Sequence, residues 1–92
     1  MKLFELYAII CERRDHPKPG SYTAKLLAQG EDEILKKVGE EAVEVILAAK
    51  AQGDERVIEE ISDLMYHLLV LLSARGLSFE EIETELGRRH LG

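Results

Sequence analysis

The chain has few of the residues that mark several common classes of protein. Among its 92 residues are no tryptophan, two phenylalanines, three tyrosines and a single cysteine, Cys11. One cysteine excludes an internal disulfide and a metal site built from several cysteines. Because aromatic residues are so scarce, the core must be built from leucine, isoleucine, valine and alanine, which suits helices packed on helices.

A long apolar segment is also lacking. The longest apolar run, Leu64–Leu72 interrupted by His67, is about half of the roughly 20 residues that a membrane-spanning helix needs. The amino terminus has an acid at Glu5 and no uninterrupted apolar stretch, which is unlike a signal peptide. We therefore expect no membrane partner and a cytoplasmic location.

Positive charge is in deficit, with eighteen acidic residues against twelve basic ones and a net charge of −6. A protein that binds duplex nucleic acid normally needs a basic face, so nucleic acid is not the expected partner. A nucleotide substrate remains compatible, because carboxylates can hold a divalent cation that supplies the positive charge phosphates need. The mixed composition, 46% hydrophobic and 33% charged, indicates one folded domain over residues 1–92.

Apolar spacing predicts five helices and no strand, and hence an all-α helical bundle. The predicted helices cover about residues 2–14, 22–29, 32–52, 54–75 and 79–89. Ser21 and Asp54 are the expected N-caps of the second and fourth helices, and Ser78 with Glu81 forms a capping box for the fifth. Gly53 and Gly76 are placed to end the third and fourth. The third helix carries an apolar stripe formed by Ile34, Val38, Ala42, Val45 and Ala49.

The segment Leu64–Leu72 is apolar nearly all the way round its helix. A helix of this kind must be covered on every side, and four other short helices can hardly do so. We therefore expect a homodimer formed through this segment. The alternative is a central helix inside a monomer.

Four acids on the two long helices form two pairs. Glu41 with Glu44, and Glu60 with Asp63, are three residues apart and so are neighbours on one helix face. If the helices pack antiparallel across the short turn between them, the pairs face each other at similar heights. Four facing carboxylates cannot all stay ionised in a poorly solvated place without compensation. Mg²⁺ supplies it, because it binds carboxylates, waters and phosphate oxygens.

Each acid taken alone has a simpler interpretation as surface charge, for example as an ordinary ion pair between Lys37 and Glu41. The register favours the metal site, because Glu60, Asp63 and His67 share a stripe with the most apolar part of the chain at about 100° per residue. Solvated charge is not usual there. His67 itself is expected to be a packed interior histidine, with a metal-ligand role as the alternative.

The pattern EExxE at 40–44, followed after fifteen residues by ExxD at 60–63, resembles the metal-binding signature of the all-α, MazG-like nucleoside triphosphate pyrophosphohydrolases. That resemblance implies that Glu41, Glu44, Glu60 and Asp63 are the metal ligands. Glu40 or Glu44 is the candidate that orients or deprotonates the attacking water.

Three blocks narrow the resemblance: residues 21–23, 36–42 and 63–69 are similar, in that order, to blocks of the phosphoribosyl-ATP pyrophosphohydrolase family. They span nearly the whole chain. The similarity implies Mg²⁺-dependent hydrolysis of phosphoribosyl-ATP to phosphoribosyl-AMP and pyrophosphate, the second step of histidine biosynthesis. It also implies the stand-alone form, because 92 residues leave no room for the cyclohydrolase domain that is often fused to it. The alternatives are a MazG-type enzyme acting on ordinary or damaged nucleoside triphosphates and a non-catalytic dimerisation module.

Phosphate contacts are expected from hydroxyl groups and cations around these blocks. For each of them, helix capping or ordinary solvated charge is the alternative. The candidates are Ser21, Thr23, Lys25, Lys36, Lys37 and Arg13, with Arg14 as a further cation for the second ribose phosphate.

Overall fold

The computed structural model describes residues 1–90, so the last two residues of the predicted domain, Leu91 and Gly92, lie outside the described residues. Five helices and no strand occur within residues 1–90, which confirms the all-α prediction. In chain order they are α1 (Leu3–Asp15), α2 (Tyr22–Gln29), α3 (Glu31–Ala51), α4 (Asp54–Ala74) and α5 (Phe79–Arg89). No helix in this part of the chain is both long and apolar enough to cross a membrane.

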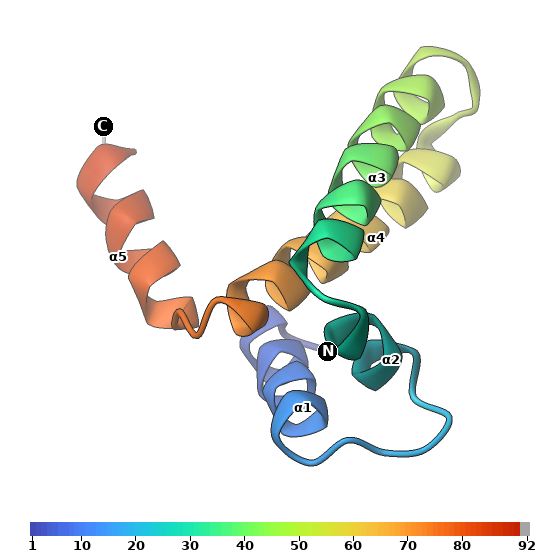
Figure 1. Ribbon diagram of the computed structural model, residues 1–92. Helices are drawn as coiled ribbons and strands as arrows, with labels where there is room; N and C mark the ends of the chain where they lie inside the picture. The colour runs from blue at the N-terminus through green and yellow to red at the C-terminus, as the bar shows by residue number, and fades with distance from the viewer. Residues whose placement is uncertain (91–92) are drawn as a thin grey trace.

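The two longest helices, α3 and α4, lie antiparallel and form the most extensive helix pair (Figure 1). Gly53 reverses the chain between them with a φ of 87°, a left-handed conformation that glycine adopts without a steric cost. Gly53 also occupies the N-cap of α4, and Asp54 is the first helical residue. The predicted capping by Asp54 was therefore wrong by one position, because the tight reversal places the glycine at the helix boundary.

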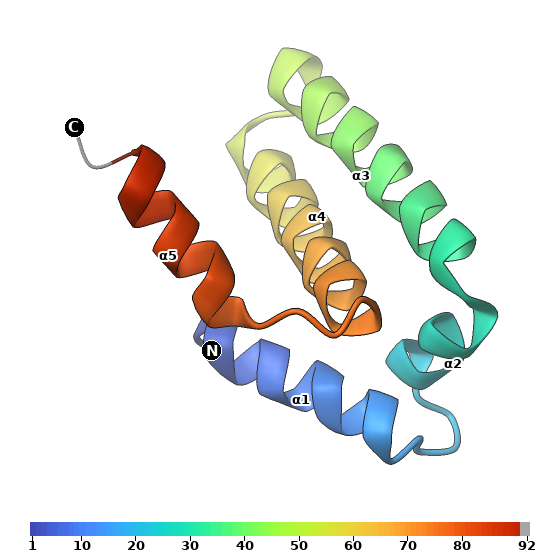
Figure 2. The ribbon, with the colours of Figure 1, turned by 60° about the vertical axis from the view of Figure 1, so that its left-hand side comes forward.

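Both α1 and α2 pack across one end of this hairpin (Figure 2). The buried core draws on four helices and consists of Tyr7, Ile10, Leu26, Ile34, Leu69, Val70 and Leu72. Polar contacts fix α1 to the end of α4. Arg14 donates to the carbonyl oxygen of Ser73 at 2.7 Å, and the Tyr7 hydroxyl donates to the carbonyl oxygen of Leu77.

The apolar stripe of α3 was predicted correctly at its start and wrongly at its end. Ile34 and Ala48 are fully buried, whereas the predicted Ala49 is exposed. Ile34 and Ala48 are fourteen residues apart, two repeats of seven. Helices that lie side by side bury positions that repeat about every 3.5 residues. The predicted stripe advances fifteen residues from Ile34 to Ala49, one more than two repeats of seven, and so leaves the interface at its end.

The fifth helix extends away from the α3–α4 hairpin in both views, while Phe79 at its start packs against the core (Figures 1 and 2). Its capping box is present: the Ser78 hydroxyl accepts from the amide of Glu81, and the Glu81 carboxylate accepts from the amide of Ser78 at 2.8 Å. An apolar groove of about 440 Å³ lies between α4 and α5. On α4, Met65 and Leu68 remain 43% and 44% exposed, although most of the predicted apolar segment is covered.

The hydroxyl of Tyr7 gives a test of how α1 is attached. Burial and the nearby Cys11 thiol raise the pKa of Tyr7 to about 12. A group with a raised folded-state pKa stabilises the fold below its unfolded pKa, here about 10, and this contribution is lost as the pH rises through the folded value. We expect Tyr7→Phe to lower the free energy of unfolding by about 1 kcal/mol near neutral pH. The difference in free energy of unfolding between the wild type and Tyr7→Phe should shrink as the pH rises from about 10 to about 12. Denaturant unfolding at several pH values measures it, and a difference that does not change with pH would contradict the assignment.

A candidate metal centre between α3 and α4

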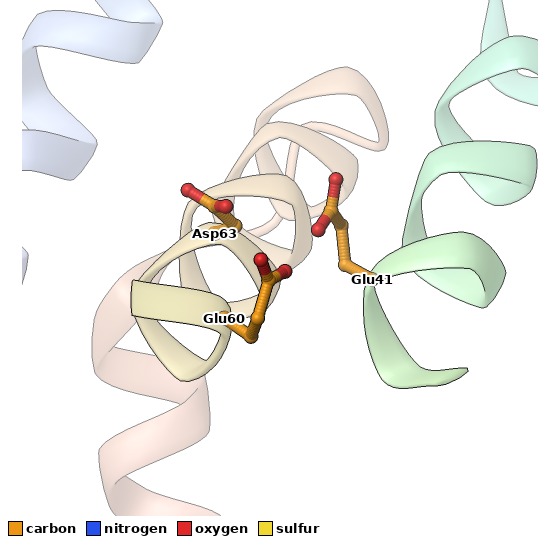
Figure 3. A group of neighbouring side chains, drawn as sticks. All are labelled: Glu41, Glu60 and Asp63. Carbon is orange, nitrogen blue, oxygen red and sulfur yellow. The ribbon is translucent and has the colours of Figure 1, made fainter. Parts of the chain in front are cut away.

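Three carboxylates meet where α3 packs against α4. Glu41 extends from α3 toward Glu60 and Asp63, which stand one turn apart on α4 (Figure 3). One oxygen from each lies within 4.8 Å of the others. Glu60 is buried, Glu41 is half-buried and Asp63 is exposed. The group is therefore closed on the Glu60 side and open to solvent at Asp63.

The buried member, Glu60, is only 6% exposed. Its carboxylate forms an ion pair with Arg56, four residues earlier on the same helix, which also binds Glu59. A buried carboxylate without a partner is strongly unfavourable, so this pairing explains how Glu60 is tolerated inside the hairpin. Arg56 and Glu60 have the ordinary i, i+4 spacing of a helical ion pair. The sequence alone could have predicted this pair, although Arg56 was not among the predicted site residues.

The environment of Glu41 opposes its ionisation. Burial, nearness to Glu60 and the charge of Asp63 together raise the pKa of the Glu41 carboxyl group, while His67 acts in the opposite direction. Like charges in a partly desolvated place destabilise the ionised form. In the absence of a cation, the fold therefore carries an electrostatic cost at this point.

The three oxygens fit a hard divalent cation. Ligands bound to one Mg²⁺ at 2.0–2.1 Å are separated by at most about 4 Å, so the spacing within 4.8 Å needs only a small movement of flexible side chains. An all-oxygen, anionic donor set suits Mg²⁺ better than metals that prefer nitrogen or sulfur. Three carboxylates from the chain also leave coordination positions for water and for phosphate oxygens.

The fourth predicted ligand, Glu44, is not part of this group. It lies three residues beyond Glu41, an advance of about 4.5 Å along α3, and is half-buried. Glu40 is exposed, and its carboxylate lies 3.9 Å from Lys37 Nζ. Within residues 1–90, Glu44 forms no ion pair.

His67 is packed beside the carboxylates rather than placed among them. It is 6% exposed, as expected for an interior histidine. Its Nδ1–H donates to the carbonyl oxygen of Asp63 at 2.8 Å, since a carbonyl can only accept. In the neutral imidazole with its proton on Nδ1, Nε2 accepts from the Tyr22 hydroxyl at 3.2 Å. In this way α2 is tied to the turn of α4 that carries Asp63.

The predicted phosphate-binding residues fall into two groups. The Ser21 hydroxyl caps α2 by accepting from the amide of Ala24 at 3.1 Å, and Thr23 is hydrogen-bonded to the Tyr66 hydroxyl. Cations form the second group. Lys36 and Lys37 are on α3 near Glu40 and Glu41, whereas Lys25 and Arg13 come from α2 and α1. In the part of the chain that the structure describes, none of Lys25, Lys36 and Arg13 forms an ion pair, while Arg14 binds Asp15 and Ser73.

Known proteins resemble the chain over nearly its whole length. Residues 3–90 match the protein family described as phosphoribosyl-ATP pyrophosphohydrolase. A phosphoribosyl-ATP pyrophosphatase of Lactiplantibacillus plantarum is 55% identical over 85 residues, which cover 92% of this chain and 80% of the relative. A protein of the same name from Metallosphaera sedula is 51% identical over 87 residues, 95% of this chain and 94% of the relative. A histidine biosynthesis bifunctional protein of Oceanobacillus iheyensis is 47% identical over 95% of this chain, which spans 40% of that relative.

Thermal melting with and without Mg²⁺ tests the carboxylate group. The raised pKa of Glu41 means that its ionised form destabilises the metal-free fold as the pH rises through that pKa. We expect Glu41→Gln and Asp63→Asn to melt at or above the wild-type temperature without metal. Wild type should gain about 2.7 kcal/mol of stability at Mg²⁺ concentrations near 100 times Kd, and both variants should lose that gain.

The matched control is Glu33→Gln, which removes a charge from the first turn of the same helix and should keep the Mg²⁺ effect. A Mg²⁺-dependent rise in melting temperature that survives in Glu41→Gln would exclude Glu41 as a ligand.

Proposed function

This chain belongs to the phosphoribosyl-ATP pyrophosphohydrolase family, and we propose that it hydrolyses phosphoribosyl-ATP to phosphoribosyl-AMP and pyrophosphate in histidine biosynthesis. The structural observation that carries the proposal is the convergence of Glu41, Glu60 and Asp63 from two helices. Such a group is a poor surface for a free polyphosphate and a good one for a polyphosphate bound with a cation. We infer that the reaction takes place in the cytoplasm.

We propose Mg²⁺ as the cation. When bound, it supplies positive charge to the phosphate oxygens and lowers the pKa of a coordinated water. The chain's own residues hold it in place. Arg56 fixes the orientation of Glu60, Glu41 reaches across from α3, and exposed Asp63 marks the side from which the nucleotide enters.

Of the two candidates for orienting the attacking water, the contacts favour Glu44. Glu40 is exposed, and its carboxylate is already in contact with a cation, 3.9 Å from Lys37 Nζ. Glu44 is half-buried, one turn from Glu41, and forms no ion pair within residues 1–90. A carboxylate without a competing cation is better placed to accept a proton from water. Glu44 also remains a candidate fourth ligand, because a glutamate side chain spans the distance of one helical turn.

Lys36 and Lys37 are the cations that we propose for the phosphate chain. Both are on α3 within one turn or so of Glu41, and Lys36 borders a shallow hollow with Gly39, Glu40 and Glu44. The second ribose phosphate is a separate negative charge and requires a separate cation. Lys25 and Arg13, on α2 and α1, are the candidates for that contact. The Ser21 oxygen accepts a hydrogen bond within α2, and Thr23 is hydrogen-bonded to Tyr66 on α4. The Ser21 hydroxyl can still donate its proton to a phosphate oxygen.

We also propose that the protein is a homodimer through α4. Exposed apolar residues remain on both long helices, notably Ile61, Met65 and Leu68 on α4 and Val43 and Ile46 on α3. Ile61 and Met65 are each two residues from Asp63, so they point about 160° away from it around the helix. Val43 has the same relation to Glu41. A second copy packed on the apolar row of α4 covers that row while leaving the carboxylate side open to the nucleotide.

A substrate panel tests the proposed activity. With Mg²⁺ held constant, kcat/KM for phosphoribosyl-ATP should exceed that for ATP, dCTP and dUTP by on the order of 100-fold or more, because plain nucleotides leave the cations for the second phosphate unpaired. Products should be phosphoribosyl-AMP and pyrophosphate. A deoxynucleotide with the highest kcat/KM would move the assignment to a MazG-type triphosphate pyrophosphohydrolase. No pyrophosphate release from any substrate would instead support a non-catalytic dimerisation module.

Light scattering tests the homodimer. We expect a dimeric mass for the wild type at micromolar concentration and a monomeric mass for Leu68→Glu, because a charge in the apolar interface is desolvated without a partner. Ile9→Glu is the control, since Ile9 on α1 is similarly exposed at 41% and lies on a different helix. A monomeric wild type in a well-folded sample would refute the interface.

A further inference from the structure

Tyr22, the first residue of α2, combines an exposed ring with a fixed hydroxyl. The residue is 51% exposed, yet its hydroxyl donates to Nε2 of the buried His67 at 3.2 Å. The other imidazole nitrogen, Nδ1, donates to the carbonyl oxygen of Asp63 at 2.8 Å. A single imidazole ring thus separates the Tyr22 hydroxyl from the backbone of a carboxylate in the proposed metal centre.

The surroundings of Tyr22 hold its ring in one orientation. The ring stands edge-on to His67, with centroids 6.2 Å apart and an interplanar angle of 87°, and lies 6.3 Å from the ring of Tyr66. Tyr66 in turn is hydrogen-bonded through its hydroxyl to Thr23. Because the Tyr22 hydroxyl is committed to His67, what the residue still offers to a ligand is a flat apolar surface.

We propose that the exposed face of Tyr22 is the surface on which the purine base of the nucleotide stacks. The inference rests on the proposed function, which supplies an adenine base. In that nucleotide one ribose separates the base from the first phosphate, and in the protein one imidazole separates Tyr22 from Asp63. A phosphate held at Glu41, Glu60 and Asp63 leaves the base one sugar away, and Tyr22 is an exposed aromatic residue linked through His67 to the turn of α4 that carries Asp63.

The ring of Tyr22, already held by His67, favours stacking of a base for two reasons. Base–aromatic stacking contributes appreciably to binding and tolerates any base, since every base has a flat π face. A ring already fixed by His67 loses little conformational freedom when the base arrives. Tyr22 is then a substrate-contacting residue, and His67 is a positioning residue that acts through it and through Asp63.

Calorimetric titration in Mg²⁺ with three ligands separates stacking from metal binding. AMP carries a base, ribose 5-phosphate lacks it, and pyrophosphate lacks both base and sugar. We expect Tyr22→Leu to weaken AMP binding roughly 10-fold while ribose 5-phosphate and pyrophosphate bind as they do to the wild type. Tyr22→Phe keeps the ring, loses the hydrogen bond to His67, and should retain most of the AMP affinity. Phe4→Leu removes a 57% exposed ring from α1 and should leave all three affinities unchanged.

Several results would overturn the proposal. Unchanged AMP binding by Tyr22→Leu would do so, and so would equal weakening of AMP and pyrophosphate, which would indicate that Tyr22 only supports the metal centre. A change in mass by light scattering without a selective loss of AMP would make Tyr22 a subunit contact. Turnover of phosphoribosyl-ATP by the wild type is measured separately. Its absence, together with a selective loss of AMP binding in Tyr22→Leu, would reject the proposed function and support the stacking surface.

Discussion

Where α3 packs against α4, carboxylates of the two helices are brought close together and repel one another. The neighbouring contacts either compensate these charges or leave them open to solvent. Glu60 is buried in the contact and is compensated by Arg56 of its own helix. Glu41 faces it from α3, and burial, nearness to Glu60 and the charge of Asp63 raise its pKa. Ordinary helix packing would place apolar residues at these positions. Retaining acids there lowers the stability of the fold without a cation, and these acids are the basis of the metal site that we propose.

The remaining helices determine how this place is reached. Because α1 and α2 pack across one end of the hairpin, α2 lies beside the turn of α4 that carries Asp63, and the chain of hydrogen bonds from Tyr22 through His67 fixes that relation. The apolar rows of α3 and α4 point away from the carboxylates. A surface for a second copy and an opening for a nucleotide can therefore coexist on one hairpin.

Much of this arrangement was predictable from the sequence because it depends on local rules. Helix ends followed Ser21, Gly53, Gly76 and Ser78 to within about two residues, and the ExxD spacing located Glu60 and Asp63 on one face. Tertiary geometry decided what local rules could not. Helix packing buries Ala48 in place of the predicted Ala49, and Glu44 lies outside the group formed by Glu41, Glu60 and Asp63. The separate position of α5 and the hydrogen bond between Tyr22 and His67, forty-five residues apart, have no sequence signal.

The central claim is that one divalent cation is held jointly by α3 and α4 through Glu41, Glu60 and Asp63. Crystals grown with Mn²⁺ in place of Mg²⁺ allow the ion to be located by its anomalous scattering. A peak within coordinating distance of all three carboxylates, with Glu60 still contacting Arg56, is the predicted result. A peak bound by residues of only one helix, or no peak at this position with the ion saturating, would contradict the account.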